Sequence, residues 1–233
     1  MIEVGQVISY LDMCREENVS LQRGMNYRTG GNYSIILMSL RQNAPYADRV
    51  EENGRVLIYE GHDAPKNQET PNPKAIDQPM FNPGGSLTQN GQFYEAALKH
   101  KNGKGRVELV KVYEKIRNGI WVYNGIFNLV DAWQEESSIS RKVFKFKLAF
   151  AVEIQKIIAD KSADEPEQDR LIPSWVKLEV WKRDKGQCSK CGSKQNLHFD
   201  HIIPYSRGGS SSDPQNIQIL CAKHNLEKRD KIE

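Results

Sequence analysis

The stretch "CSKCGSKQNLHFDHIIPYSRGGSSSDPQNIQILCAKHN", residues 188–225, decides how the C-terminal part of the chain folds. It holds three of the four cysteines and three of the five histidines of the chain. Cys188 and Cys191 form a C-x-x-C pair, and Cys221 and His224 form a C-x-x-H pair. Three thiolates and one imidazole at these spacings can form the tetrahedron of a closed structural Zn²⁺ site. The alternative is reduced cysteines that only pack in the interior, but this requires two independent short spacings to coincide by chance.

Length and composition favour one medium and one small globular domain. The chain has 233 residues, of which 38% are hydrophobic and 27% charged. No apolar run approaches the roughly 20 residues that span a bilayer, which predicts no membrane association. The N-terminus lacks the basic start and apolar stretch of a secretion signal, so we expect a cytoplasmic protein with reduced thiols.

Charge is distributed unevenly along the chain. Residues 171–233 contain 11 Lys and Arg against 7 Asp and Glu, a net charge of +4, which leaves 22 against 23, or −1, for the first 170 residues. A positive C-terminal part fits contact with phosphates, although it is equally typical of a solvated surface.

Hydrophobic patterning predicts an α+β protein with a β-rich N-terminal domain. Strand-like patterns occupy 33–40, 54–61, 106–116, 119–136 and 141–150, and a short helical pattern occupies 92–103. Residues 64–92 are rich in Pro, Asn, Gln and Gly and read as a long loop, a candidate binding element. We expect domains at 1–155 and 173–233, joined by an acidic, proline-containing linker at 156–172.

A second, more open site is predicted between the two cysteine-containing pairs. Asp200 and His201 follow residues of strand character, and an open loop returns to the chain at Asn216. A carboxylate beside an imidazole offers an oxygen ligand for a hard divalent ion together with a base.

These residues, with Asn225 after His224, resemble the HNH nucleases, whose motif is a zinc-stapled ββα-metal finger. The resemblance implies that His201 is the general base that activates water and that Asp200 binds a catalytic Mg²⁺ or Mn²⁺ ion. Asn225 stands where the family often has histidine, and would be the second ligand of that ion. Asn216 would tether the loop that carries His201.

Arg207 and Lys228 are candidates for contacts with the DNA backbone, with solvated surface charges as the alternative. The alternative for the whole C-terminal set is a domain that binds metal and DNA without cutting.

Four ordered blocks in the N-terminal part resemble the SRA, or YDG, domain. They are "GGNYSIILMS" (30–39), "YADRVEENGRVLIYEGHD" (46–63), "LTQNGQFYEAAL" (87–98) and "WVYNGIFNLVDAW" (121–133). The signature Tyr-Asp-Gly is present as Tyr-Asn-Gly at 123–125. The resemblance implies a PUA-like β-barrel that flips a cytosine out of the duplex and reads its modification.

By position, Tyr46 and Tyr59 would be the aromatic side chains of the modified-base pocket. Asp48 would face the Watson–Crick edge, because a carboxylate can accept a hydrogen bond from the exocyclic amine of cytosine. Core packing is the alternative for either tyrosine. For His62 and Asp63 we expect a hydrogen bond in a loop or a place at the pocket edge.

Together these patterns predict a modification-dependent DNA endonuclease with a structural Zn²⁺ and one catalytic divalent ion. Its partner would be double-stranded DNA containing 5-methylcytosine or 5-hydroxymethylcytosine. Because one HNH site cuts one strand, we expect a homodimer. Two alternatives stay open: a nuclease or nickase for unmodified DNA, and a catalytically inactive DNA-binding module.

Overall fold

The computed structural model describes residues 2–21, 23–29, 31–41, 43–52, 55–151, 171–229 and 231–232. Within these ranges the predicted α+β class is confirmed, with a β-rich N-terminal domain (2–151) followed by a small C-terminal domain (171–232). The predicted linker at 156–172 lies outside the described residues except for its last two.

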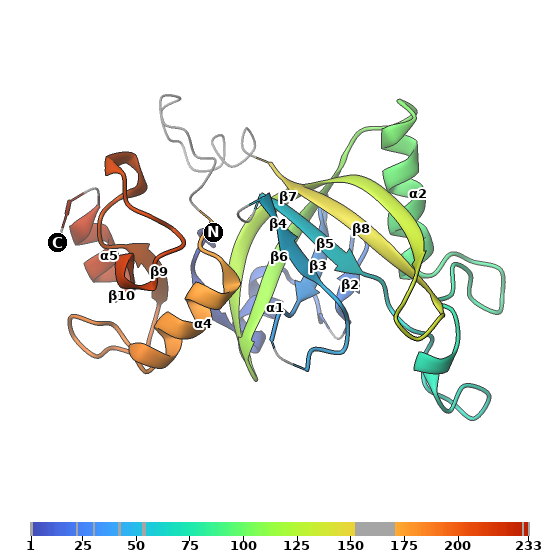
Figure 1. Cartoon of the computed structure of the whole chain (residues 1–233), viewed down its shortest axis with the longest axis horizontal. Helices are drawn as coiled ribbons and strands as arrows, with labels where there is room; N and C mark the ends of the chain where they lie inside the picture. Colours follow the sequence, from blue (N-terminus) through green and yellow to red (C-terminus); the bar gives the residue numbers. More distant parts are fainter. Residues whose placement is uncertain are drawn as a thin grey trace.

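One curved sheet forms most of the N-terminal domain (Figure 1). Its strands are β1 (Val7–Ser9), β2 (Met25–Asn26), β3 (Ser34–Met38), β4 (Arg49–Glu51), β5 (Val56–Glu60), β6 (Glu108–Arg117), β7 (Ile120–Glu136) and β8 (Lys142–Phe150). They run in the order β2-β3-β6-β7-β8-β5-β4, and β1 pairs with β7. Two helices, α1 (Tyr10–Glu16) and α2 (Gln89–Lys101), accompany the sheet.

Buried aromatic side chains hold α2 against the sheet. Phe93 of α2 contacts Phe146 of β8 edge to face, with ring centroids 5.9 Å apart, and Phe127 of β7 belongs to the same core. The helix begins where the Thr88 side chain accepts a hydrogen bond from the N–H of Gly91, as expected of an N-cap threonine. The sequence therefore places this helix by both its cap and its apolar face.

The long segment between β5 and α2 is mostly irregular, as its composition predicts. Within it, a short 3-10 turn, η2, occupies Pro73–Ala75, and Phe81 forms an isolated bridge with Leu87.

The C-terminal domain consists of an entry helix and a ββα unit. The elements are α4 (Ser174–Arg183), β9 (Leu197–His201), η4 (Tyr205–Arg207), η5 (Pro214–Asn216), β10 (Ile217–Cys221) and α5 (Ala222–Lys228). β9 and β10 are antiparallel, with His201 opposite Ile217 and Cys221 opposite Leu197. This register puts the Asp200–His201 pair at one end of the hairpin and Cys221 at the other.

In the part of the chain that the structure describes, no helix has the length and apolar character needed to cross a membrane.

Candidate functional site

The four predicted zinc ligands converge at the end of the C-terminal hairpin. The donor atoms of Cys188, Cys191, Cys221 and His224 all lie within 4.8 Å of one another. Zn–S bonds of about 2.3 Å place neighbouring sulfurs of a tetrahedron about 3.8 Å apart. The sulfur atoms of Cys191 and Cys221 are 3.9 Å apart, and His224 Nδ1 lies 3.4 Å from the Cys221 sulfur. The arrangement fits a tetrahedral metal site.

The pKa of the Cys188 thiol is lower than that of a free cysteine. Burial opposes its thiolate, but backbone N–H groups at Cys221, Cys191 and Lys190, together with the His224 side chain, lower its pKa to about 6. The thiolate is the form that binds metal, which supports the same assignment.

A glycine-containing loop folds over the end of β9 and brings a serine to His201. A Cβ on Gly209 would lie 1.8 Å from the carbonyl oxygen of Ile203, so only glycine permits this close approach. The loop places the buried hydroxyl of Ser211 2.8 Å from His201 Nε2. Ser211 thus orients the imidazole ring, a contact that sequence reasoning missed because the serine lies in a run of three.

The side chain of Asn216 also holds this loop, through hydrogen bonds to its backbone. Its Oδ1 accepts a hydrogen bond from the N–H of Ile203 at 2.8 Å, and its Nδ2 donates to the carbonyl oxygens of Ile203 and Ser210 at 3.1 and 3.0 Å. These three hydrogen bonds join Asn216 to both Ile203 and Ser210 of the loop.

The position of Lys228 contradicts the prediction that it contacts the DNA backbone. Its side chain is 1% exposed, and its Nζ lies 2.9 Å from Asp200 Oδ2. Asn225 precedes Lys228 by three residues on α5, a spacing that puts both on one face of the helix. The Lys228–Asp200 contact shows that this face of α5 points toward β9. Asn225 on α5 and Asp200 on β9 therefore lie on two elements that face each other. Arg207, by contrast, is exposed on η4, as a phosphate contact requires.

A carboxylate and an amide oxygen fit a hard divalent cation. Asp200 is 22% exposed, and the ammonium of Lys228 contacts its Oδ2. Asp200 and Asn225 are the residues that would hold the ion.

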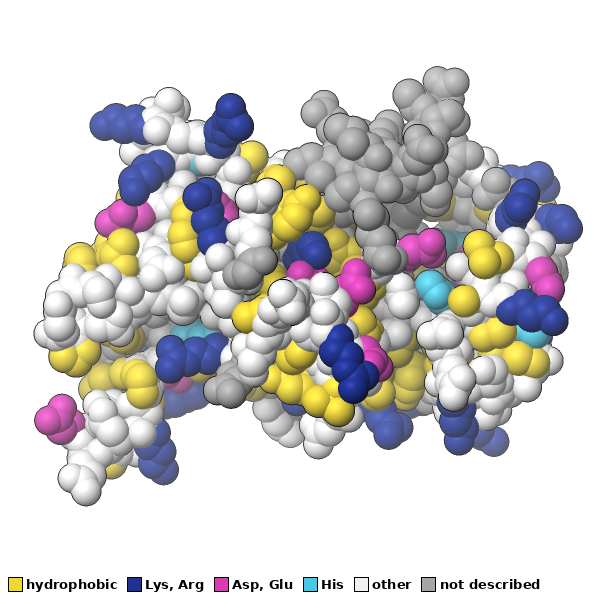
Figure 2. All heavy atoms as spheres, turned by 180° about the vertical axis from the view of Figure 1, so that it is seen from behind, with side chains coloured by type: hydrophobic (Ala, Val, Ile, Leu, Met, Phe, Trp, Pro, Cys, Tyr) yellow, Lys and Arg dark blue, Asp and Glu magenta, His cyan; other side chains and the backbone are white. Residues whose placement is uncertain are grey.

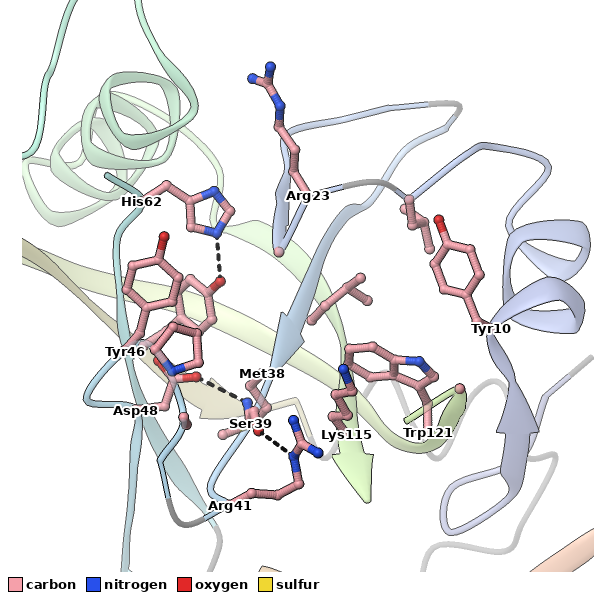
Figure 3. A pocket seen from close by; sticks show the side chains of 17 residues that line it. Tyr10, Arg23, Met38, Ser39, Arg41, Tyr46, Asp48, His62, Lys115 and Trp121 are labelled. Carbon is pink, nitrogen blue, oxygen red and sulfur yellow. Dashed lines mark hydrogen bonds between the residues drawn. The ribbon is translucent and has the colours of Figure 1, made fainter. Parts of the chain in front are cut away.

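A cavity of about 760 Å³ in the N-terminal domain is lined by all three predicted pocket residues, Tyr46, Asp48 and Tyr59. This volume lies within the range of about 300–1,000 Å³ that ligand sites occupy. Figure 3 shows Tyr46, Asp48 and His62 along one wall, with Lys115 and Trp121 opposite.

The Asp48 carboxylate is fixed by the backbone. Its Oδ2 accepts a hydrogen bond from the N–H of Ser39 at 3.2 Å and its Oδ1 from the N–H of Glu60 at 3.0 Å. Burial raises the pKa of Asp48 to about 6, against these two hydrogen bonds, which lower it. The pKa of Asp48 is therefore well above that of an exposed carboxyl group.

His62 lies at the edge of the pocket, which is one of the two positions expected from the sequence. Its ring stacks on Tyr46 with centroids 5.5 Å apart and an interplanar angle of 20°, and its Nε2 shares a hydrogen bond of 3.0 Å with the Tyr59 hydroxyl. Burial lowers the pKa of His62 to about 4, so the ring is neutral at pH 7. Gly24 makes room for this pair, because a Cβ there would lie 2.6 Å from the Tyr59 hydroxyl.

Cationic side chains that sequence reasoning missed also line the cavity: Arg23, Arg41 and Lys115. Desolvation and the nearby charge of Arg41 lower the pKa of Lys115, whose Nζ lies 5.6 Å from the centre of the Trp121 ring. Two neighbouring cations at a cavity favour an anionic group such as a phosphate. On the face seen from behind, Lys and Arg side chains are scattered rather than gathered in one patch (Figure 2).

The chain combines a cavity lined by aromatic and carboxylate side chains with a ββα unit that carries an acid, a histidine and four candidate metal ligands. This combination is that of an HNH-type DNA endonuclease with an added β-rich domain. The chain belongs to the SAD/SRA domain family, which its residues 2–151 match, and residues 188–231 match the HNH endonuclease family. Both predicted resemblances are confirmed.

Solved structures similar to this chain include two SUVH5 SRA complexes and one restriction enzyme. The SUVH5 SRA complex with hemi-methylated CG DNA is 28% identical and covers 64% of this chain and 89% of that chain, with a TM-score of 0.44. The SUVH5 SRA complex with fully hydroxymethylated CG DNA is 27% identical with the same coverage and TM-score. The modification-dependent TagI restriction endonuclease is 20% identical and covers 97% of this chain and 76% of that chain, with a TM-score of 0.44. A comparison with curated proteins finds no match.

Proposed function

We propose that the chain is a modification-dependent DNA endonuclease. Its N-terminal cavity takes a 5-methylcytosine or 5-hydroxymethylcytosine flipped out of the duplex, and its HNH domain hydrolyses a phosphodiester nearby. The observation that carries the proposal is the convergence of Tyr46, Asp48 and Tyr59 on one cavity in a chain that also holds the Asp200–His201 pair.

The cavity has the chemistry that a flipped base needs. Aromatic rings can cover the π face of the base, and the Asp48 carboxylate can accept a hydrogen bond from the exocyclic amine of cytosine. Arg41 and Lys115 would hold the phosphate that turns with the flipped nucleotide.

In the HNH domain, His201 would accept the proton of the attacking water, with its ring held by Ser211. Arg207 would contact the DNA backbone from its exposed position. Asp200 and Asn225 would hold one Mg²⁺ or Mn²⁺ ion, and such an ion would supply stabilisation of negative charge on the phosphate. We assign Zn²⁺ to the Cys188, Cys191, Cys221 and His224 cluster as a structural ion.

Cleavage of one plasmid in unmodified, 5-methylcytosine and 5-hydroxymethylcytosine forms tests both parts of the proposal. We expect wild type to cut a modified form only. His201→Ala should lower cleavage at least about 100-fold, the loss of a general base, while DNA binding persists. His100→Ala on α2 is the matched control and should cut like wild type.

Asp48→Ala tests the cavity, with Asp131→Ala on β7 as the control because Asp131 does not line it. Loss of discrimination in Asp48→Ala alone supports the proposal. If Asp48→Ala discriminates as wild type does, or if wild type cuts all three forms equally, the N-terminal domain is not the reader. If wild type cuts none of them, the chain is a binding module.

Cutting both strands needs two HNH sites or two visits by one site. We propose that two copies of the chain act on one duplex. Sedimentation that finds only monomers, with and without modified DNA, would contradict this.

A further inference from the structure

The two domains share one hydrophobic core rather than touching through their surfaces. Ile116 of β6 and Val122 of β7 belong to the N-terminal sheet, yet both lie in a buried cluster with Val176 of α4, Phe199 of β9 and Ile219 of β10. Figure 1 shows α4 lying between the sheet and the ββα unit. Ile172, at the end of the predicted linker, is buried in the same cluster.

A backbone connection also joins the sheet to the strand that carries Asp200 and His201. Gly5 donates its N–H to the carbonyl oxygen of Tyr123 at 2.9 Å and accepts a hydrogen bond from the N–H of Phe199 at 3.1 Å. Gln6 bridges His198 in antiparallel fashion. Gly5 has φ +84°, and a Cβ there would lie 3.2 Å from the carbonyl oxygen of Phe199, so this crossing point favours glycine. Residues 5 and 6 therefore extend the N-terminal sheet into β9.

A buried polar network fixes α4 to the signature segment of the N-terminal domain. Lys177 Nζ lies 3.1 Å from Glu114 Oε2 and 2.6 Å from Asn124 Oδ1, and Asn124 Nδ2 donates to Glu114 Oε2 at 3.0 Å. All three residues are at most 6% exposed. Val112 pairs with Gly125 and Tyr113 with Tyr123, so Asn124 is the extra residue of a β-bulge.

A bulge redirects a side chain, and this one directs Asn124 at Lys177. Asn124 stands where the signature has Asp, and its neutral amide satisfies both charged groups of the network.

The cavity and the surface that contacts the C-terminal domain lie on opposite faces of β6 and β7. Lys115 and Trp121 pair with each other across β6 and β7, and both line the cavity. Their neighbours Glu114 and Val122 also pair with each other, and they contact the C-terminal domain. Successive residues of a strand point to opposite faces, so a single layer of backbone separates the two surfaces.

We propose that the β6–β7 ladder is a rigid spacer that fixes the distance between the flipped base and the phosphate that is cut, and that Lys177, Glu114, Asn124 and Gly5 are the positioning residues that set it. The inference rests on the proposed function. In this proposal the folded contacts between the two domains, and not a flexible linker, determine which phosphate is cut.

The test is a duplex with one modified cytosine, cut by the full chain and mapped at nucleotide resolution. We expect wild type to cut one strand mainly at one phosphate, because one modified cytosine positions one HNH site. The paired variant Lys177→Met with Glu114→Gln removes both charges together, so no buried charge is left alone. In it, the share of cuts at the main phosphate should fall at least about twofold, with new cuts at neighbouring phosphates.

The control pair is Lys182→Met with Glu179→Gln, which removes one exposed lysine and one exposed glutamate from the same helix. It should keep the wild-type cut positions.

Wild-type hydrogen exchange provides a measurement that requires no variant. The amide of Phe199 donates to the carbonyl oxygen of Gly5, and the amide of Tyr123 donates to that of Gln6. The two amides should exchange at rates within about tenfold of each other once corrected for intrinsic rates. Exchange of Phe199 more than about 100-fold faster would overturn the inference, because the nuclease domain would then open independently of the sheet.

The possible failures are distinct. Cutting of modified DNA only, with the same positions in wild type and in the paired variant, overturns the rigid spacer and leaves the proposed function intact. Wild-type cuts scattered over many phosphates do the same. Equal cutting of modified and unmodified duplexes overturns the proposed function itself.

Discussion

Asp48→Asn should change the way in which stability depends on pH. Folding raises the pKa of Asp48 from 3.8 to about 6, because burial disfavours its charged form. A raised carboxyl pKa contributes stability that is complete below about pH 3.8 and is lost as the pH rises through 6. The difference between the two values corresponds to about 3 kcal/mol in total, and about 2 kcal/mol of it falls between pH 4.5 and 7.5.

Asp48 keeps some contact with solvent, which reduces the effect, so we expect at least about 1 kcal/mol over this interval. Asparagine removes the titration. It also places an amide N–H₂ opposite one of the two backbone N–H donors, a cost that does not vary with pH.

The assay is urea unfolding of wild type and Asp48→Asn at several pH values from 4.5 to 7.5. The free energy of unfolding of wild type, minus that of the variant, should fall steadily as the pH rises. Asp131→Asn serves as the control for the loss of one acidic charge outside the cavity. A difference that stays constant within about 0.5 kcal/mol, or that rises with pH, would show that the Asp48 carboxylate is well solvated and that the cavity is not a desolvated pocket.

Three further predictions concern the C-terminal domain. If the cysteine cluster holds Zn²⁺ as proposed, a strong chelator or Cys221→Ser should unfold residues 171–232, because structural zinc supplies on the order of 10 kcal/mol of folding free energy. Metal analysis and circular dichroism measure this, and an unchanged spectrum would contradict it. Lys228→Met should lower the free energy of unfolding by about 1–3 kcal/mol, since it leaves the half-buried Asp200 without its cation. A loss below about 0.5 kcal/mol would show that this ion pair does not stabilise the fold. Asn216→Ala removes three hydrogen bonds of the loop that carries Ser211, so it should cost about 2–3 kcal/mol and lower kcat, with the neighbouring exposed Gln215→Ala as the control.

The order of the elements could be predicted from sequence because local patterns determine it. The apolar patterns at 33–40, 54–61 and 106–150 correspond to strands, and the pattern after Thr88 corresponds to a helix. The two short cysteine-containing spacings identified the four candidate metal ligands, because a ligand pair separated by two residues can reach one ion whatever the fold of the rest of the chain.

Other features depend on segments that are distant in sequence. Lys228 shows no local sign of burial, yet α5 packs it against Asp200 of β9. Ser211 reaches His201 only because the loop closes at Gly209. The cations of the cavity come from different strands and loops and form no run in the sequence.

The sequence by itself determined the residues to which we assign the chemistry: the four candidate metal ligands, the Asp200–His201 pair and the aromatic and acidic residues of the cavity. Only the tertiary structure decided how the two domains are joined. The shared core, the crossing at Gly5 and the network around Lys177 each pair residues more than 50 positions apart, and no local pattern encodes such pairings. Their physical origin is the alternation of side chains along β6 and β7, which gives one face of the ladder to the cavity and the other to the nuclease domain.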